Sequence, residues 1–314
     1  MSVEAEQSPS GTAIRITEVG PRDGLQNEPP VPLVAKIAFI DALSRAGVTE
    51  IEAGAFVSPA AVPQMADSDD VFRKIARRPD VVYSALVPNL RGLDRALAAG
   101  VQKVSVFTAA SETFAARNIH ATIEESLARF KPVVIRAHEA GLRVRGYLST
   151  VAFCPYEGRM APERVVQVMR RLIDLGVDEV SLGETVGKAS PTDMRRLLDH
   201  AMPAASGTGL SIHCHDTHGM AVANALTAWS EYGIQAFDAS AGGLGGCPYA
   251  PGASGNVATE DLVYALKASG ARVEADEIKV VEAAARVAPY LPHALRSRVS
   301  LVAQDPHPAG AEKG

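Results

Sequence analysis

Two histidines separated by a single residue stand in a short strand-like segment, LSIHCHD, which begins at Leu210. Because side chains alternate between the two faces of a strand, His213 and His215 would point to one side and Cys214 to the other. Together with an aspartate and an amide oxygen, two imidazoles would form a set of nitrogen and oxygen ligands suited to Mg, Mn or another divalent cation. The alternative is that both histidines are simply polar residues at the end of a strand.

Other residues of catalytic type stand near the carboxyl ends of other strand-like segments. They are Arg22 and Asp23 after the first segment, Glu52 in the second, Glu184 in the sixth, and Cys247 and Asn256 in a glycine-rich loop after the eighth. In a barrel of parallel strands these ends form one face, so we expect the residues to share one site. His218, three residues after His215, is predicted to be exposed or to orient other groups rather than to be a third ligand.

The elements that would position these residues follow a repeated pattern. A helix-like stretch closes on glycine, and a β-branched or apolar segment begins within a few residues. The pattern occurs in the segments that begin at Ala46, Ala99, Ala140, Leu175 and Tyr232. Glycine just past a helix end adopts the left-handed conformation at little cost, and the segment after it is typical of a buried strand. The repeat therefore predicts five junctions from helix to strand.

Three more strand-like segments, beginning at Ile14, Val81 and Leu210, bring the total to eight. Helices are expected between them, for example over 33–46, 123–140, 162–175 and 220–232, and two start signals agree: Thr122 with Glu125 in capping-box spacing, and Ser190 before Pro191. Eight alternations predict an α/β fold, a closed (β/α)8 TIM barrel. An open doubly wound sheet is disfavoured, because no G-x-G-x-x-G motif follows the first strand.

The chain is predicted to form one domain. We expect a disordered tail over residues 1–12, a catalytic barrel with additional C-terminal helices over 13–300, and a flexible tail over 301–314. The segment after Thr259 is predicted to be helical to about Leu295 and to flank the barrel.

Composition narrows the class of protein. A net charge of −5 argues against a general nucleic-acid binder, and no apolar run approaches the roughly 20 residues that cross a bilayer. The first twelve residues contain two Glu and no Lys or Arg, unlike a mitochondrial presequence. Three widely spaced cysteines without a C-x-x-C motif suit reduced thiols in a cytoplasmic protein and cannot form an all-thiolate zinc site.

From about Ile14 to Ala268 the chain resembles the 3-hydroxy-3-methylglutaryl-CoA (HMG-CoA) lyase family. The shared stretches are VGPRDGLQNE, FVSP with VPQMAD, AASETF with RNI, TIEES, CPYEG, HCHDTHG and GGLGGCPYAPGASGNVATEDLVY. The resemblance implies a homodimeric, cytoplasmic enzyme with a role in degrading leucine or a similar branched compound. Its substrate would be an acyl-CoA thioester, and its cofactor a divalent cation such as Mg or Mn.

The resemblance also implies roles for individual residues. Asp23, His213, His215 and Asn256 look like the metal ligands. Arg22 looks like the cation that faces the substrate carbonyl and the developing enolate, and Cys247 resembles the family's general acid. Glu52 resembles a substrate-positioning acid, although it would equally suit a barrel-interior partner of Arg22. Asp23 and His213 both remain open as the base that removes the hydroxyl proton.

The sequence departs from the family's pattern at three places near the site. Glu184 stands where the family usually has Asp, His218 where it usually has Tyr, and IEAGAF replaces a segment that usually carries Thr and Ser. Glu184 and His218 are accordingly expected to line the substrate pocket. A longer or branched 3-hydroxyacyl-CoA, or a condensing reaction in the reverse direction, remains an alternative. Lys103 and His120 are expected at the surface.

Overall fold

The computed structural model describes residues 12–246 and 255–304. Eight parallel strands close into a barrel in the order β1-β10-β9-β8-β5-β4-β3-β2, which confirms the predicted TIM barrel. Their bounds are β1 Arg15–Glu18, β2 Glu50–Ala55, β3 Val82–Leu86, β4 Lys103–Ala109, β5 Arg143–Ser149, β8 Glu179–Glu184, β9 Gly209–Cys214 and β10 Ala236–Ala239. Because β1 pairs with both β2 and β10, the sheet has no open edge, which rules out the doubly wound alternative.

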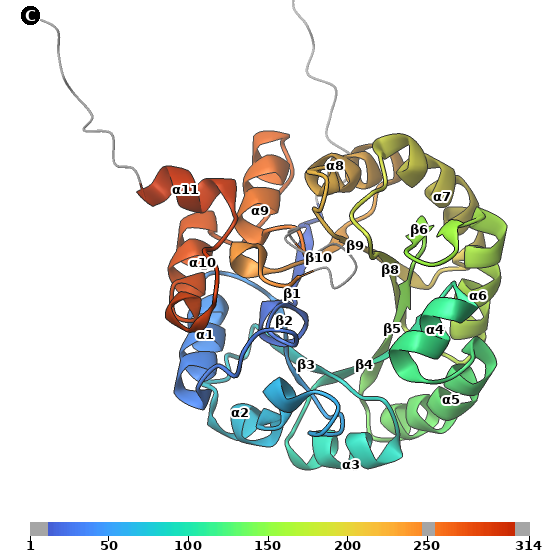
Figure 1. The fold of residues 1–314 in the computed structure, drawn as a ribbon, viewed down its shortest axis with the longest axis horizontal. Coiled ribbons are helices and arrows are strands. Elements are labelled where there is room, and N and C mark those ends of the chain that lie inside the picture. Colours follow the sequence, from blue (N-terminus) through green and yellow to red (C-terminus); the bar gives the residue numbers. More distant parts are fainter. Residues whose placement is uncertain (1–11, 247–254, 305–314) are drawn as a thin grey trace, which may run out of the picture.

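The helices form a ring outside the barrel, in chain order (Figure 1). They are α1 Leu33–Arg45, α2 Ser68–Lys74, α3 Leu90–Ala98, α4 Glu112–Ile119, α5 Ile123–Glu139, α6 Pro162–Asp174, α7 Pro191–Ala204, α8 Ala221–Tyr232, α9 Thr259–Ala268, α10 Glu277–Ala284 and α11 Arg298–Gln304. A short hairpin of β6 (Phe153–Cys154) and β7 (Gly158–Arg159) follows β5. The hydrophobic core lies between strands and helices, with Phe39, Leu148 and Val180 fully buried.

The predicted local signals recur in the structure. Thr122 and Glu125 form a complete capping box at α5, and Ser190 caps α7 with Pro191 in its first turn. The five junction glycines, Gly47, Gly100, Gly141, Gly176 and Gly233, all have positive φ. At Gly47 a Cβ would lie 2.6 Å from the carbonyl oxygen of Glu274, so both the conformation and the space require glycine.

The prediction of continuous helix from Thr259 to about Leu295 is wrong. Gly270, with φ +91°, follows the end of α9, and Val273 then forms a parallel bridge with Ile14. Two prolines, Pro289 and Pro292, lie between α10 and α11, where proline cannot continue a helix. The last described helix, α11, extends past residue 300, where the predicted domain ended.

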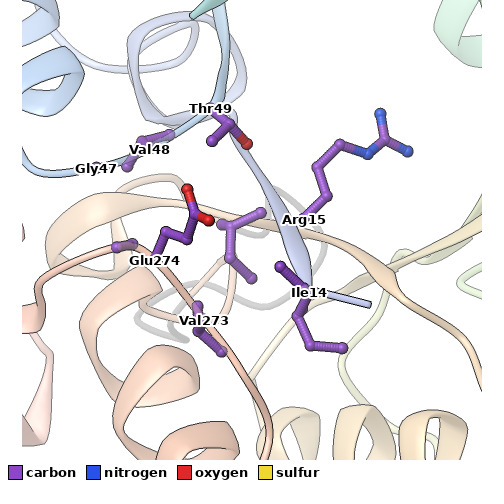
Figure 2. Close-up of a pocket in the computed structure, with 10 residues that line it drawn as sticks. Ile14, Arg15, Gly47, Val48, Thr49, Val273 and Glu274 are labelled. Atoms are coloured by element: carbon purple, nitrogen blue, oxygen red, sulfur yellow. The ribbon is translucent and has the colours of Figure 1, made fainter. Parts of the chain in front are cut away.

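A cavity of about 210 Å³ lies at the amino-terminal end of the barrel, beside the bridge between Ile14 and Val273. It is lined by the start of β1 with the two residues before it, by the segment that leads into β2 and by the segment before α10 (Figure 2). The guanidinium of Arg15 points away from Val273 and Glu274 in this view. The cavity is therefore at the opposite end of the strands from the predicted catalytic residues.

The barrel interior next to this cavity is charged. Arg15 donates to Glu50 over 2.6 Å and is also paired with Glu179. Lys103, expected at the surface, is only 4% exposed and its Nζ lies 2.8 Å from Glu50 Oε1. It is the first residue of β4 and its side chain turns inward, which the sequence around it did not reveal. His120 is exposed, as expected.

Candidate active site

The four residues predicted as metal ligands meet at the carboxyl end of the barrel. One ligand atom each from Asp23, His213 and His215 lie within 4.8 Å of one another. Asn256 Nδ2 donates a hydrogen bond of 2.9 Å to Asp23 Oδ2, and the residue is held beside His215 by a β-bridge. Three separate stretches of the chain therefore contribute to one cluster.

The cluster contains nitrogen and oxygen atoms that are not engaged in hydrogen bonds and could coordinate a divalent cation. His215 Nδ1 and Asn256 Oδ1 are buried and have no hydrogen-bond partner among the described residues. A buried polar atom without a partner is costly, and a ligand removes that cost. The imidazole, carboxylate and amide groups together suit a divalent ion of intermediate or hard character, so the residues fit the implied cofactor.

The protonation states of His215 and Asp23 favour metal binding, whereas at His213 the carboxylates of Asp238 and Asp23 outweigh burial and raise the pKa. Burial lowers the pKa of His215, and the neighbouring His213 lowers it further, to about 4. Burial alone would raise the pKa of Asp23, but the charge of Arg22, the two neighbouring imidazoles and the hydrogen bond from Asn256 together outweigh burial and bring the pKa to about 2. At neutral pH His215 is therefore neutral and Asp23 ionised, which are the forms that bind metals.

Arg22 lies directly beside the cluster, in a single π-helical turn, Gly20–Gly24, that follows β1. Its Nε donates to Glu52 over 2.5 Å and its Nη1 to Asp23 over 2.7 Å. Its guanidinium also lies over the ring of Tyr147, 5.4 Å from the centroid. Burial opposes the charge on Arg22, but the carboxylates of Glu52 and Asp23 raise its pKa above the ordinary value. Arg22 is thus a fixed cation of which only 6% is exposed.

Glu52 occupies the interior position that the sequence left as one of two possibilities. It is fully buried, accepts from Arg22 through Oε2 and accepts from Ser105 Oγ through Oε1 over 2.5 Å. The structure therefore shows the pairing with Arg22, and any contact with a substrate would be made through that pair.

The side chain of Glu18 holds the backbone turn that carries Arg22. Its Oε1 accepts the backbone N–H groups of Gly20 and Ala241, over 2.8 and 2.9 Å, and its Oε2 accepts from Thr259 over 2.6 Å. One buried carboxyl thus joins the end of β1, the start of the glycine-rich loop and the start of α9. Burial raises the pKa of Glu18 to about 7.

Glu184 ends β8 and is fully buried. Burial raises its pKa to about 7, although backbone N–H groups of the following turn oppose the shift. Its Oε2 has no hydrogen-bond partner among the described residues. Glu184 therefore offers a carboxyl group that changes charge near neutral pH.

The remaining predicted site residues are placed differently. His218 is exposed and does not belong to the half-buried cluster of Asp23, His213 and His215; its backbone N–H donates to the carbonyl of Gly187. Cys247 lies outside the described residues. The base of its loop is described: Gly255 N–H donates to Gly245 O over 3.0 Å, so the two sides of the loop meet beside Asn256.

Sequence reasoning missed several interior residues of this site. Asp238 on β10, Arg145 and Tyr147 on β5 and Ser181 on β8 all lie in the barrel interior beside or below the histidines. The signal was available as polar residues at alternate positions of otherwise apolar strands, such as Asp238 between Phe237 and Ala239.

Comparison with known proteins gives consistent results. The model of the HMGL-like family matches residues 13–287. A hydroxymethylglutaryl-CoA lyase of Pseudomonas mevalonii is 48% identical, over 92% of this chain and 96% of that protein. A cytoplasmic 3-hydroxy-3-methylglutaryl-CoA lyase of Rattus norvegicus is 50% identical, over 86% of this chain and 79% of that protein.

Solved structures agree with these relatives. The crystal structure of hydroxymethylglutaryl-CoA lyase from Pseudomonas aeruginosa superimposes with a TM-score of 0.90 at 47% identity, over 93% of this chain and 98% of that one. An HMG-CoA lyase from Acinetobacter baumannii, solved in complex with coenzyme A and 3-methylmalate, gives 0.88 at 36% identity, over 95% and 98%. The resemblance seen in the motifs is confirmed along nearly the whole barrel, and the chain belongs to the HMGL-like family, together with the hydroxymethylglutaryl-CoA lyases.

Proposed function

We propose that this protein is a divalent-metal-dependent carbon–carbon lyase that splits 3-hydroxy-3-methylglutaryl-CoA into acetyl-CoA and acetoacetate. The observation that carries the proposal is the meeting of Asp23, His213, His215 and Asn256 beside the buried Arg22–Glu52 pair. The names of the relatives support the substrate, and the coenzyme A in the Acinetobacter baumannii structure supports a thioester ligand.

The residues can divide the reaction between them. A divalent cation held by the four ligands would act as a Lewis acid toward the 3-hydroxyl and the neighbouring carboxylate of the substrate. Loss of the hydroxyl proton, to Asp23 or His213, gives an alkoxide whose collapse breaks the C2–C3 bond. The electron pair of that bond passes into the enolate of acetyl-CoA.

Arg22 is the side chain proposed to stabilise the negative charge of the enolate. Its charge is fixed by Glu52 and Asp23 before substrate binds, so no reorganisation is needed when negative charge develops on the thioester oxygen. The enolate carbon then takes up a proton, for which Cys247 is the proposed donor. Glu184 and His218 are proposed to line the substrate pocket, Glu184 from the buried side and His218 from the rim.

The substrate is tested with a set of thioesters. Purified protein with Mg or Mn is incubated separately with the methylglutaryl thioester, with 3-hydroxyglutaryl-CoA and with longer or branched 3-hydroxyacyl-CoA analogues, and acetyl-CoA release is followed. We expect the highest kcat/KM with the methylglutaryl substrate. A higher value with a longer or branched analogue would replace it, while leaving the reaction type intact.

The assembly and compartment are also proposals. We propose a homodimer in the cytoplasm, in keeping with the family resemblance. Among the relatives, some are named cytoplasmic and others mitochondrial. No helix among the described residues is both long and apolar enough to cross a bilayer. Apolar side chains exposed on α9, α10 and α11, such as Tyr264, Ile278 and Val302, are available for contact between protomers.

A further inference from the structure

A buried carboxylate lies next to one of the two histidines. The strands β9 and β10 are neighbours in the barrel (Figure 1), and His213 on β9 is the register partner of Asp238 on β10. Because register partners on parallel strands project to the same face of the sheet, the two side chains lie side by side. Asp238 is 1% exposed, and its Oδ2 lies 3.4 Å from Nδ1 of His213. The contact is longer than a well-formed hydrogen bond, and Nδ1 has no closer partner among the described residues.

Asp238 is itself firmly held. Ser181 Oγ donates to its Oδ2 over 2.7 Å, and Arg145 Nη1 donates to its Oδ1 over 2.8 Å. Arg145 is anchored in turn, since its Nε donates to Glu179 over 2.5 Å and its Nη2 to Thr17 over 2.9 Å. The carboxylate therefore has little freedom to turn away from the imidazole.

The two histidines of the cluster differ in this respect. Nδ1 of His215 is buried with no partner among the described residues, whereas Nδ1 of His213 faces a carboxylate. A carboxylate at Nδ1 favours the tautomer that carries its proton there, and this leaves the lone pair of Nε2 free for a metal. Carboxylates that hold ligating histidines in this way strengthen metal binding.

We propose that Asp238 is a positioning residue for the metal centre: it fixes the ring and tautomer of His213 through Nδ1, and Ser181 and Arg145 fix Asp238. The inference rests on the metal site of the proposed function. It extends that site from its four ligands to a supporting chain of buried residues on β5, β8 and β10, none of which touches the cation.

Binding of Mn²⁺ to the substrate-free protein, measured by isothermal titration calorimetry, tests the proposal. Asp238→Asn keeps the volume of the side chain but removes its charge, and an amide can hydrogen-bond to either tautomer of the imidazole. We expect the Kd for Mn²⁺ to rise about 10- to 100-fold. The ¹⁵N shifts of the His213 ring, in histidine-labelled protein, should report loss of the single tautomer.

Glu50→Gln is the control for a merely structural effect. Glu50 is another buried carboxylate of the barrel interior, but its side-chain hydrogen bonds go to Arg15 and Lys103, which are not part of the chain that holds Asp238. We expect this variant to lower the unfolding temperature while leaving the Kd for Mn²⁺ within about twofold of the unchanged protein. A Kd that rises equally in both variants would overturn the proposal, because the effect would follow stability rather than contact with the imidazole.

A gentler pair of variants keeps the test decisive if Asp238→Asn does not fold. Ser181→Ala removes the hydroxyl that donates to Asp238. Ser211, the register partner of Ser181 on β9, has a buried hydroxyl with no hydrogen-bond partner among the described residues, so Ser211→Ala is the matched control. We expect Ser181→Ala to weaken Mn²⁺ binding severalfold and Ser211→Ala to leave it unchanged.

The outcomes separate the proposed role of Asp238 from the proposed metal centre itself. A folded Asp238→Asn variant with unchanged Mn²⁺ affinity would contradict the role of Asp238, and so would equal affinities of the two serine variants where Asp238→Asn is unfolded. Unchanged protein that binds no Mn²⁺ would overturn the metal centre and this inference with it. A wrong choice of thioester affects neither result, because no substrate is present.

Discussion

Arg22 enters the site with its charge already balanced by two carboxylates, Glu52 and Asp23. A buried guanidinium held in this way cannot move to a different partner when substrate binds. Its value to the reaction lies in a fixed direction of positive charge, which is worth most where water is excluded.

Replacement of Arg22 by lysine separates charge from geometry. Lysine keeps the charge but has one compact ammonium group in place of the planar fork that reaches both Glu52 and Asp23. We expect Arg22→Lys to lower kcat by about 10²- to 10³-fold, the usual effect of losing one preorganised oxyanion donor. The measurement is steady-state turnover of the methylglutaryl thioester with saturating Mn²⁺.

The control is Arg171→Lys, which makes the same change in an exposed ion pair with Glu124. It should leave kcat unchanged, because exposed pairs contribute little and the residue is remote from the cluster. Equal turnover of Arg22→Lys and the unchanged protein would remove Arg22 from the mechanism.

At the scale of the elements, Glu18 connects the turn that carries Arg22 to the glycine-rich loop and to α9. Burial raises its pKa from 4.5 to about 7, so between these values the folded protein binds a proton that the unfolded chain has released. The free energy of unfolding therefore falls as pH rises through this window. The contribution of one such carboxyl is roughly 3 kcal/mol.

Glu18→Gln should remove this part of the pH dependence. Glutamine keeps an acceptor for the two backbone N–H groups and cannot ionise. Urea unfolding at pH 5 and pH 8 should show a smaller loss of stability in the variant than in the unchanged protein. Glu125→Gln serves as the control, because the pKa of Glu125 is lowered by its cap hydrogen bonds and it titrates below the window. An unchanged slope in Glu18→Gln would refute the assignment.

Two junction glycines form a matched pair. An alanine at Gly141 would meet no atom within 4 Å, whereas at Gly47 its Cβ would lie 2.6 Å from Glu274 O. Both substitutions place a side chain at positive φ, which costs roughly 1 to 2 kcal/mol. Gly47→Ala should therefore lower the unfolding temperature further than Gly141→Ala. Equal losses in a thermal scan would mean that the conformation alone, and not the contact with Glu274, requires glycine at position 47.

These elements also show how far the sequence could predict the structure. Helix ends such as Leu33 and Thr122 carry local signals, namely a preceding proline and a capping box, and they were placed within a residue. The prediction of helix after Thr259 failed because apolar periodicity continues through Gly270. In the structure the chain leaves the helix there, and Val273 forms a bridge with Ile14. Local propensity does not contain that long-range contact.

For the whole molecule, the barrel interior was the part that sequence reasoning missed. The strand sequences are mostly apolar because most of their residues pack against the helices. The side chains that point into the barrel include charged groups, and these pair with one another across the interior. Lys103 appeared to be a surface residue, since its partners Glu50 and Glu179 are more than fifty residues away in the chain. The meeting of the four predicted ligands was easier to anticipate, because they lie at or beyond the carboxyl ends of strands, and these ends form one face of a barrel.

The proposed homodimer is a prediction at this scale. Light scattering after size exclusion should give about 66 kDa, twice the 33.0 kDa of one chain. Val302→Glu, which places a charge among the exposed apolar side chains of α11, should weaken association if that surface lies between the protomers. The control is Val34→Glu on α1, where valine is similarly exposed. A mass of one chain at micromolar concentration would contradict the dimer.

The most direct test of the central claim is metal removal and return. The protein is stripped with chelator, its metal content is measured, and release of acetyl-CoA and acetoacetate from 3-hydroxy-3-methylglutaryl-CoA is followed as Mn²⁺ or Mg²⁺ is added stepwise. We predict no turnover in the stripped protein and full recovery at one ion per chain, with no recovery in His215→Ala over the same range. Full turnover by protein shown to be metal-free would contradict the account.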